Sequence, residues 1–194
     1  VINKVRELRI ENLLDIGCGE GYYTDAMQSE VLQCVGVDIA KNAVQVAAKI
    51  NKNITWVVGT GATLPVLDQS IDLCSSLFSP IPKQEILRVL KPQGYLLVVT
   101  PAPQHLYAMR EALFEEVKPH EPSKFVEQLS DAFDLVSDDV VDAELKLNQQ
   151  DLQNLIAMTP YAYKAKQERR EALEAQTAFE LQAQYQILLF QKKA

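Results

Sequence analysis

The stretch "LLDIGCGEGYYT", residues Leu13 to Thr24, decides how this chain is expected to fold. It begins with a short apolar run typical of a buried strand, passes through three glycines in five positions and continues into a segment with helical spacing. Because glycine has no Cβ, such a turn lets the backbone approach a ligand that side chains would keep away. The stretch therefore predicts a strand, a ligand-binding turn and a helix.

The acidic residues around this turn indicate which ligand it receives. Asp15 lies in the strand and Glu20 among the glycines, so a pyrophosphate would meet two carboxylates. A ligand with positive charge, such as a sulfonium with an ammonium group, is favoured instead. Asp38 ends the next apolar run, where an acid accepts both hydroxyls of a ribose. The spacing and the acids thus predict a cationic nucleoside and disfavour a dinucleotide such as NAD.

Strand-like and helix-like segments alternate along the first half of the chain. Short apolar runs predict buried strands at 13–16, 34–38, 54–58, 71–77 and 95–100, and helical spacing predicts helices at 22–30, 40–50 and 82–90. In the second helix the apolar stripe is expected at Ala43, Val46, Ala47 and Ile50. This alternation predicts an α/β fold with a mostly parallel sheet and helices on both faces.

The last third of the chain has a different pattern. Apolar and polar residues alternate over 141–147 and 179–187, as in half-exposed strands, and helices are expected between them at 150–158 and 161–175. We expect these strands to form an antiparallel, hairpin-like edge.

Composition limits the class of protein. With 194 residues, 47% of them apolar, we expect one domain over residues 1–194. Cys18, Cys34 and Cys74 lie in or beside apolar runs without a close pair, so reduced core thiols and no metal site are expected. The absence of a long apolar run or signal-peptide pattern predicts a cytoplasmic protein without membrane contact. A net charge of −7 opposes binding to nucleic acid through phosphates alone.

Several motifs resemble those of class I S-adenosylmethionine-dependent methyltransferases, which have a Rossmann-like seven-stranded sheet. The residues that carry the resemblance are Leu14 to Gly21, Val35 to Ala40, Gly61 to Pro65, Ile71 to Cys74 and Leu87 to Tyr95. The resemblance implies S-adenosyl-L-methionine as the cofactor. Together with the motif positions it implies these cofactor-binding residues: Asp15, Gly17, Gly19, Glu20, Gly21, Asp38, Ile39, Gly61, Ala62, Leu64 and His105.

Further stretches resemble the bacterial 23S rRNA (guanine-N1)-methyltransferases: 78–80, 100–106 and 158–163. In that family the histidine of the Pro-x-Pro-x-His stretch lies against the cofactor, which is the reason for including His105. The resemblance implies a guanine in a 23S rRNA hairpin as the acceptor. The acceptor-side candidates are Phe78, Ser79, Pro80, Tyr161 and Tyr163, because a looped-out base stacks on aromatic rings.

The chain departs from that family in lacking its amino-terminal zinc module, so we expect these residues to be the catalytic fragment of a longer chain. Two other functions stay open at this point: a small-molecule methyltransferase, which the acidic balance favours, and a protein that binds the cofactor without transferring its methyl group. The sequence leaves open which guanine is modified, which residue takes its proton and whether the chain forms a homodimer.

Overall fold

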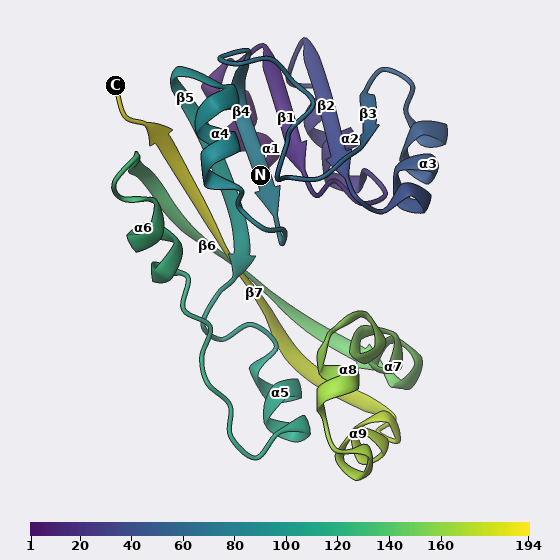
Figure 1. The fold of residues 1–194 in the computed structure, drawn as a ribbon. Helices are drawn as coiled ribbons and strands as arrows, with labels where there is room; N and C mark the ends of the chain where they lie inside the picture. The colour runs from purple at the N-terminus through teal and green to yellow at the C-terminus, as the bar shows by residue number, and fades with distance from the viewer. The chain divides into compact units, whose positions relative to one another are not determined.

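The computed structural model describes all 194 residues, Val1–Ala194, and contains one seven-stranded sheet (Figure 1). The strand order is β3-β2-β1-β4-β5-β7-β6. The strands are β1 (Asn12–Ile16), β2 (Gln33–Asp38), β3 (Thr55–Val58), β4 (Ile71–Leu77), β5 (Leu90–Pro101), β6 (Phe133–Asn148) and β7 (Ala178–Lys192). The helices are α1 (Ile2–Leu8), α2 (Tyr22–Gln28), α3 (Lys41–Ile50), α4 (Lys83–Val89), α5 (Tyr107–Leu113), α6 (Ser123–Leu129), α7 (Gln149–Met158), α8 (Tyr161–Lys164) and α9 (Gln167–Glu174).

The sheet is parallel from β3 to β5 and antiparallel at β7, as the sequence predicted. The central strand β1 pairs with β2 on one side and with β4 on the other; Ile16 lies beside Val37 and Ser76. The chain thus winds outward from β1 in both directions, which creates a topological switch point between β1 and β4. In open α/β sheets ligands bind outside the carboxyl ends of the strands at such a point.

Helices cover both faces of this sheet: in Figure 1, α4 lies in front of the strands, and α1 and α2 lie behind them. The strands between these layers are buried on both faces, so Leu14, Cys74 and Leu96 are inaccessible to solvent. All three cysteines are buried and free of disulfides, as predicted. Burial raises the pKa of Cys18 and Cys34 to about 12, which keeps these thiols protonated at neutral pH.

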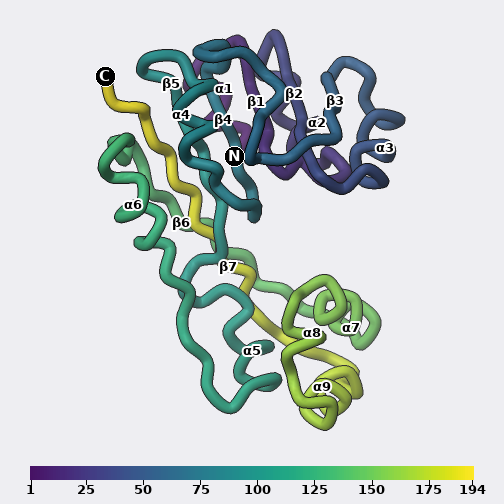
Figure 2. Tube along the Cα trace, in the orientation of Figure 1, coloured from purple at the N-terminus to yellow at the C-terminus, as the bar shows by residue number.

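The chain forms two compact units, and Figure 2 follows its path between them. Unit 1 comprises Val1–Thr100, Ser123–Asp139 and Ile187–Ala194; unit 2 comprises Pro101–Pro122 and Val140–Gln186. Unit 2 has its own apolar cluster, in which Met109, Leu152 and Ile156 are fully buried. Because β6 and β7 belong to both units, the single domain expected over residues 1–194 stays a prediction.

None of the helices has the length and apolar character needed to span a bilayer.

The buried face of α3 differs from the stripe expected from the sequence. Val46 and Ile50 are 38% and 67% exposed, whereas Val44 and Ala47 are buried. Ala47, which belongs to the expected stripe, packs against the glycine turn, because a Cβ on Gly21 would lie only 3.0 Å from the Cβ of Ala47. Val44, rather than Val46 and Ile50, is buried together with it.

The carboxyl-terminal third also differs from the prediction in its boundaries. β6 begins at Phe133, well before residue 141, and the helix expected over 161–175 is divided into α8 and α9. Residues 134–140 lack an alternating apolar pattern because they lie in the edge strand of the sheet, where most of them are exposed on both faces. α1 and α6 were not expected.

Asp72 joins the amino-terminal ends of β1, β4 and β5. Its Oδ2 accepts hydrogen bonds from the backbone N–H groups of Asn12 (2.9 Å) and Glu11 (3.3 Å), and its Oδ1 lies 2.7 Å from Nζ of Lys91. Partial burial raises the pKa of Asp72, but the hydrogen bonds from Lys91 and Asn12 outweigh it and leave the pKa below its ordinary value. Folding therefore favours the ionised carboxylate.

We expect Asp72→Ala to lower the free energy of unfolding at pH 7 by about 1–3 kcal/mol, because two backbone donors and Lys91 lose their acceptor. Since the folded-state pKa lies below the unfolded value of about 3.9, this difference is complete above about pH 4 and is lost as the pH falls through the folded-state pKa. Urea unfolding of the wild type and the variant at several pH values measures this difference in the free energy of unfolding. Asp68→Ala is the control, because it removes only an exposed pair with Arg88 and should change stability by less than about 0.5 kcal/mol. Equal losses in the two variants would contradict this role of Asp72.

Candidate functional site

A cleft of about 600 Å³ opens in unit 1 at the carboxyl ends of the parallel strands. This volume lies within the range of roughly 300–1,000 Å³ typical of small-molecule sites. The cleft lies where β1 and β4 end, at the switch point of the sheet. Four segments line it: Ile16 and Gly17; Val37, Asp38 and Ile39; Gly59 to Ala62; and Phe78 to Pro82.

The glycine turn at the end of β1 adopts a backbone conformation that favours glycine. Gly17, Gly19 and Gly21 have φ values of 77°, 55° and 84°. A Cβ on Gly17 or Gly21 would lie closer than 3.0 Å to Ser79 or Trp56, respectively, whereas one on Gly19 would meet no atom within 4 Å. The packing of unit 1 therefore requires Gly17 and Gly21, and the open space beside Gly19 is available to a ligand.

The backbone donors of this turn are bonded to the end of β2. The N–H groups of Gly17 and Cys18 donate to the carbonyl oxygen of Val37 at 2.8 and 3.1 Å, and that of Gly19 donates to Oδ2 of Asp38 at 2.8 Å. A turn that binds phosphate presents unpaired N–H groups to the anion. The partners of these donors therefore support a ligand without a pyrophosphate at this position.

Asp38 joins the glycine turn to α3 and also faces the cleft. Its Oδ2 accepts from Gly19, and its Oδ1 accepts from the N–H of Ala40 at 2.7 Å. Each oxygen of the Asp38 carboxylate can accept a second hydrogen bond, so the two oxygens together can still accept from two hydroxyl groups. Ile39 follows directly, is 76% exposed and lines the cleft with apolar surface suited to a flat base.

Asp15 lies beneath the turn rather than in the lining of the cleft. It is 2% exposed, and its carboxylate accepts hydrogen bonds from the hydroxyls of Thr24 (2.5 Å) and Ser75 (2.7 Å). Burial raises the pKa of Asp15, although these two hydrogen bonds lower it. Its contacts join β1, α2 and β4. The sequence analysis did not single out Thr24 and Ser75; for Ser75 the only signal was a hydroxyl in the mostly apolar segment 71–77.

The other cofactor candidates fall into four environments. Gly61 and Ala62 line the cleft. Leu64 is buried in the core of unit 1, while its N–H donates to Glu85 at 2.6 Å, and Glu20 is exposed on the turn. His105 belongs to unit 2, so its predicted position against the cofactor stays a prediction. Within unit 2 its ring lies 4.6 Å from that of Tyr185, and burial lowers the pKa of His105 to about 4.

Phe78 has the clearest geometry among the acceptor-side candidates. It follows β4 with a φ of 58°, its side chain is 49% exposed, and it lines the cleft. A left-handed conformation costs a non-glycine residue about 1–2 kcal/mol, so surrounding contacts must maintain it. Ser79 provides one of them, because its Oγ donates to the carbonyl oxygen of Ile16 at 2.5 Å. The ring of Phe78 lies 6.5 Å from that of Tyr23.

The two remaining aromatic candidates belong to unit 2. Tyr161 packs edge-on against Phe114, with ring centroids 5.8 Å apart, and its hydroxyl lies 3.4 Å from Nε2 of His120. Tyr163 is 89% exposed. Pro80 lines the cleft beside Phe78. Residues of the cleft that the sequence analysis did not propose, such as Thr60 and Pro82, flank the motifs that it did.

Comparison with known families identifies the domain that contains this cleft. The family model described as "Methyltransferase domain" matches residues 14–98, which include the glycine turn, Asp38 and Phe78. The chain carries a class I methyltransferase domain. The predicted Rossmann-like fold and S-adenosyl-L-methionine as the cofactor are confirmed. The residues that bind the cofactor stay predictions.

Relatives of the methyltransferase domain extend the similarity beyond the matched residues. The 23S rRNA (guanine(748)-N(1))-methyltransferase of Streptomyces fradiae is 32% identical over 155 residues, which cover 78% of this chain and 55% of that protein. YxjB of Bacillus subtilis, whose name assigns it provisionally to the 23S rRNA (guanine-N1) class, is 29% identical over 188 residues, 93% of this chain and 66% of YxjB. The chain thus spans about half to two thirds of the length of these relatives.

A solved structure supports the architecture of the methyltransferase domain. The crystal structure of the YcgJ protein of Bacillus subtilis has a TM-score of 0.64 and 23% sequence identity to this chain, covering 98% of this chain and 95% of YcgJ. This similarity concerns the fold alone.

We expect Asp38→Ala to weaken S-adenosylmethionine binding by about 1.5–3 kcal/mol, because the ribose hydroxyls lose a charged acceptor. Titration calorimetry measures this change. Asp25→Ala is a matched control, since Asp25 is an exposed acid of α2 that bonds Asn51 and does not line the cleft. Unchanged affinity in the Asp38 variant would remove Asp38 from the binding site.

Two glycine substitutions distinguish binding from folding. Gly19→Val should abolish cofactor binding, because its side chain occupies the open space left for a ligand. The methyltransferase domain should stay folded, with its stability lowered by about 1–2 kcal/mol because valine is strained at a φ of 55°. Gly21→Val should instead lower the melting temperature strongly, since its side chain would overlap Trp56. Calorimetry and thermal unfolding of both variants provide the comparison. A folded Gly19 variant that binds normally would refute the ligand-binding role of the turn.

Proposed function

We propose that this domain transfers the methyl group of S-adenosylmethionine to N1 of a guanine in a 23S rRNA hairpin. The observation that carries the proposal is the half-exposed ring of Phe78, which a left-handed backbone holds at the cofactor cleft. The Streptomyces fradiae relative, whose name states guanine N1 of 23S rRNA as its acceptor, supports this choice over 78% of the chain.

The aromatic residues near the cleft favour a planar acceptor. Tyr23 is 44% exposed next to Phe78, and Tyr22 is 80% exposed, with its ring 5.1 Å from that of Tyr23. Exposed rings at the start of α2 and after β4 offer stacking surface to an unpaired base, and such stacking contributes about 1–3 kcal/mol per base. A guanine acceptor must leave its helix or lie in a loop, because N1 is on the edge that forms Watson–Crick pairs.

The residues of the chain act mainly through positioning. Bound S-adenosylmethionine supplies an electrophilic sulfonium methyl group. Asp38 would hold the ribose and Ile39 would contact the adenine, both at the end of β2. Phe78 would orient the acceptor base from the segment that follows β4. Holding two reactants in line gives a large effective concentration, which accounts for much of the rate of such a transfer. Loss of the N1 proton makes the nitrogen lone pair available for attack.

A small-molecule acceptor is the second candidate, and the net charge of −7 favours it. An acidic protein repels the phosphates of RNA unless it presents a local basic surface. A small-molecule methyltransferase would methylate free metabolites, and its activity would depend little on salt. A protein that only binds the cofactor would show affinity without turnover.

The test uses labelled S-adenosylmethionine and unmodified bacterial 23S rRNA. A methyl group on guanine N1 blocks base pairing, so reverse transcription from a primer stops at the modified base. We expect one stop within a hairpin that depends on both enzyme and cofactor. Cofactor binding without any transfer to rRNA would reject the proposed acceptor and leave the metabolite and binding-only alternatives.

Phe78→Ala should raise KM for rRNA and lower kcat/KM by about 5–150-fold, which corresponds to removing one base-stacking interaction of about 1–3 kcal/mol. Phe78→Tyr preserves the ring and should retain most of the activity. Initial rates at varied RNA concentration measure both variants, and calorimetry checks that each still binds the cofactor. Full activity of the alanine variant would mean that Phe78 does not hold the acceptor base.

A further inference from the structure

Unit 2 contains a second hollow, of about 250 Å³, between the end of α5 and the α8–α9 segment. We name it the α8–α9 groove. Three cationic side chains, Lys164, Lys166 and Arg169, line it together with the acids Glu115 and Glu116. Its lining therefore has one more positive than negative charge, in a chain whose net charge is −7. From the sequence alone, residues 164–170 are expected to form a solvated helix face, because an acid lies among the cations, with contact to RNA phosphates as the alternative.

The cations belong to a stretch of the chain with a local excess of positive charge. Residues 158–170 contain Lys164, Lys166, Arg169 and Arg170 against the single acid Glu168, so the stretch has a net charge of +3. Such a local excess matters because the field of a charge is screened within about 8–10 Å at physiological salt. A phosphate at the groove therefore interacts mainly with the charges that line the groove itself.

The contacts of these side chains leave them accessible to a ligand. Lys166 pairs with Glu115 at 2.7 Å, but the two side chains are 72% and 65% exposed, so the pair is weak and exchangeable. Arg169 is fixed more firmly, because its Nη1 donates to the carbonyl oxygens of Phe114 (3.1 Å) and Ala112 (3.5 Å). Arg169 therefore holds a charge at the wall of the groove, and the lysines add mobile charges at its rim.

Large side chains beside these cations are exposed. Tyr163, next to Lys164 in the chain, is 89% exposed, and Met158 is 83% exposed. An exposed aromatic ring beside cations is a combination that binds flexible RNA, where the cations contact phosphates and the ring stacks on a base.

We infer that the α8–α9 groove binds the phosphodiester backbone of the RNA substrate, with Lys164 and Lys166 contacting phosphates. This inference rests on the proposed function for the identity of the RNA. It assigns a binding surface to unit 2 and explains how an acidic chain interacts with a polyanion: affinity comes from a localised basic stretch rather than from net charge.

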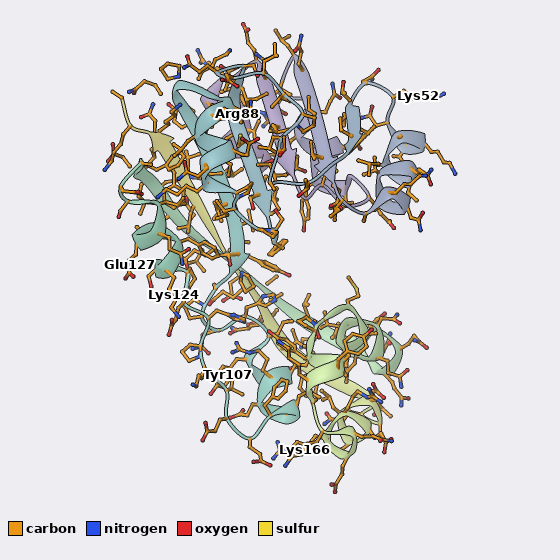
Figure 3. The ribbon with its side chains drawn as sticks, viewed as in Figure 1. Lys52, Arg88, Tyr107, Lys124, Glu127 and Lys166 are labelled. Atoms are coloured by element: carbon orange, nitrogen blue, oxygen red, sulfur yellow. The ribbon has the colours of Figure 1, made fainter.

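The experiment compares RNA binding by the wild-type protein with two double variants. The double variant Lys164→Ala/Lys166→Ala removes two positive charges from the groove. The double variant Lys49→Ala/Lys52→Ala removes two exposed positive charges from unit 1 and is the matched control. Figure 3 labels Lys52 and Lys166. The probe is an unmodified transcript of 23S rRNA. Filter binding at several salt concentrations gives the slope of log K against log salt, which should fall by about 1 for each phosphate-binding side chain removed.

We expect the groove variant to bind the transcript more weakly, with a salt slope reduced by about 2, while the control variant matches the wild type. Both variants should keep wild-type affinity for S-adenosylmethionine and wild-type melting temperatures, which separates weaker RNA binding from misfolding. An unchanged slope in the groove variant, with the wild type still methylating rRNA, would overturn the groove and leave the proposed function intact. Failure of the wild type to bind or methylate the transcript would instead overturn the proposed function, and the groove assignment with it.

Discussion

The hydrogen bonds between the glycine turn and the end of β2 determine how this domain presents its cleft. Because Val37 and Asp38 accept the N–H groups of Gly17, Cys18 and Gly19, the turn is held against β2 and its backbone donors are occupied. The same carboxylate also accepts from the start of α3. One acidic side chain thus fixes the turn, begins a helix and faces the cleft, and its negative charge favours a cationic nucleoside over a pyrophosphate.

A second set of polar contacts maintains the opposite wall of the cleft. Asp15 is buried between the hydroxyls of Thr24 and Ser75, and Ser79 donates to the carbonyl of Ile16. Buried polar groups are stable only when hydrogen-bonded, so these contacts specify one arrangement of the ends of β1 and β4. That arrangement leaves Phe78 in a left-handed conformation with its ring exposed, a strained geometry of the kind that accumulates at functional sites.

The proposed activity divides the work between two kinds of surface. Unit 1 contains the cleft, with its acid and its apolar lining, and suits a small cationic cofactor and a flat base. Unit 2 contains the α8–α9 groove, whose lining has a small excess of positive charge that suits the backbone of a polyanion. A net negative charge is compatible with RNA as a substrate when the positive charges are concentrated, because screening makes the local charge decisive.

The sequence by itself determined the strand–turn–helix at the start of the domain, the parallel α/β class and the position of Asp38, because glycine spacing and apolar runs act locally along the chain. It placed Ala47 in the buried stripe of α3 but did not show that Val44 is buried while Val46 and Ile50 are exposed. Nor did it show that Leu64 belongs to the core, or that Asp15 turns toward Thr24 and Ser75 instead of the cleft. The tertiary structure decided these points, because burial and hydrogen-bond partners depend on segments that meet only after folding.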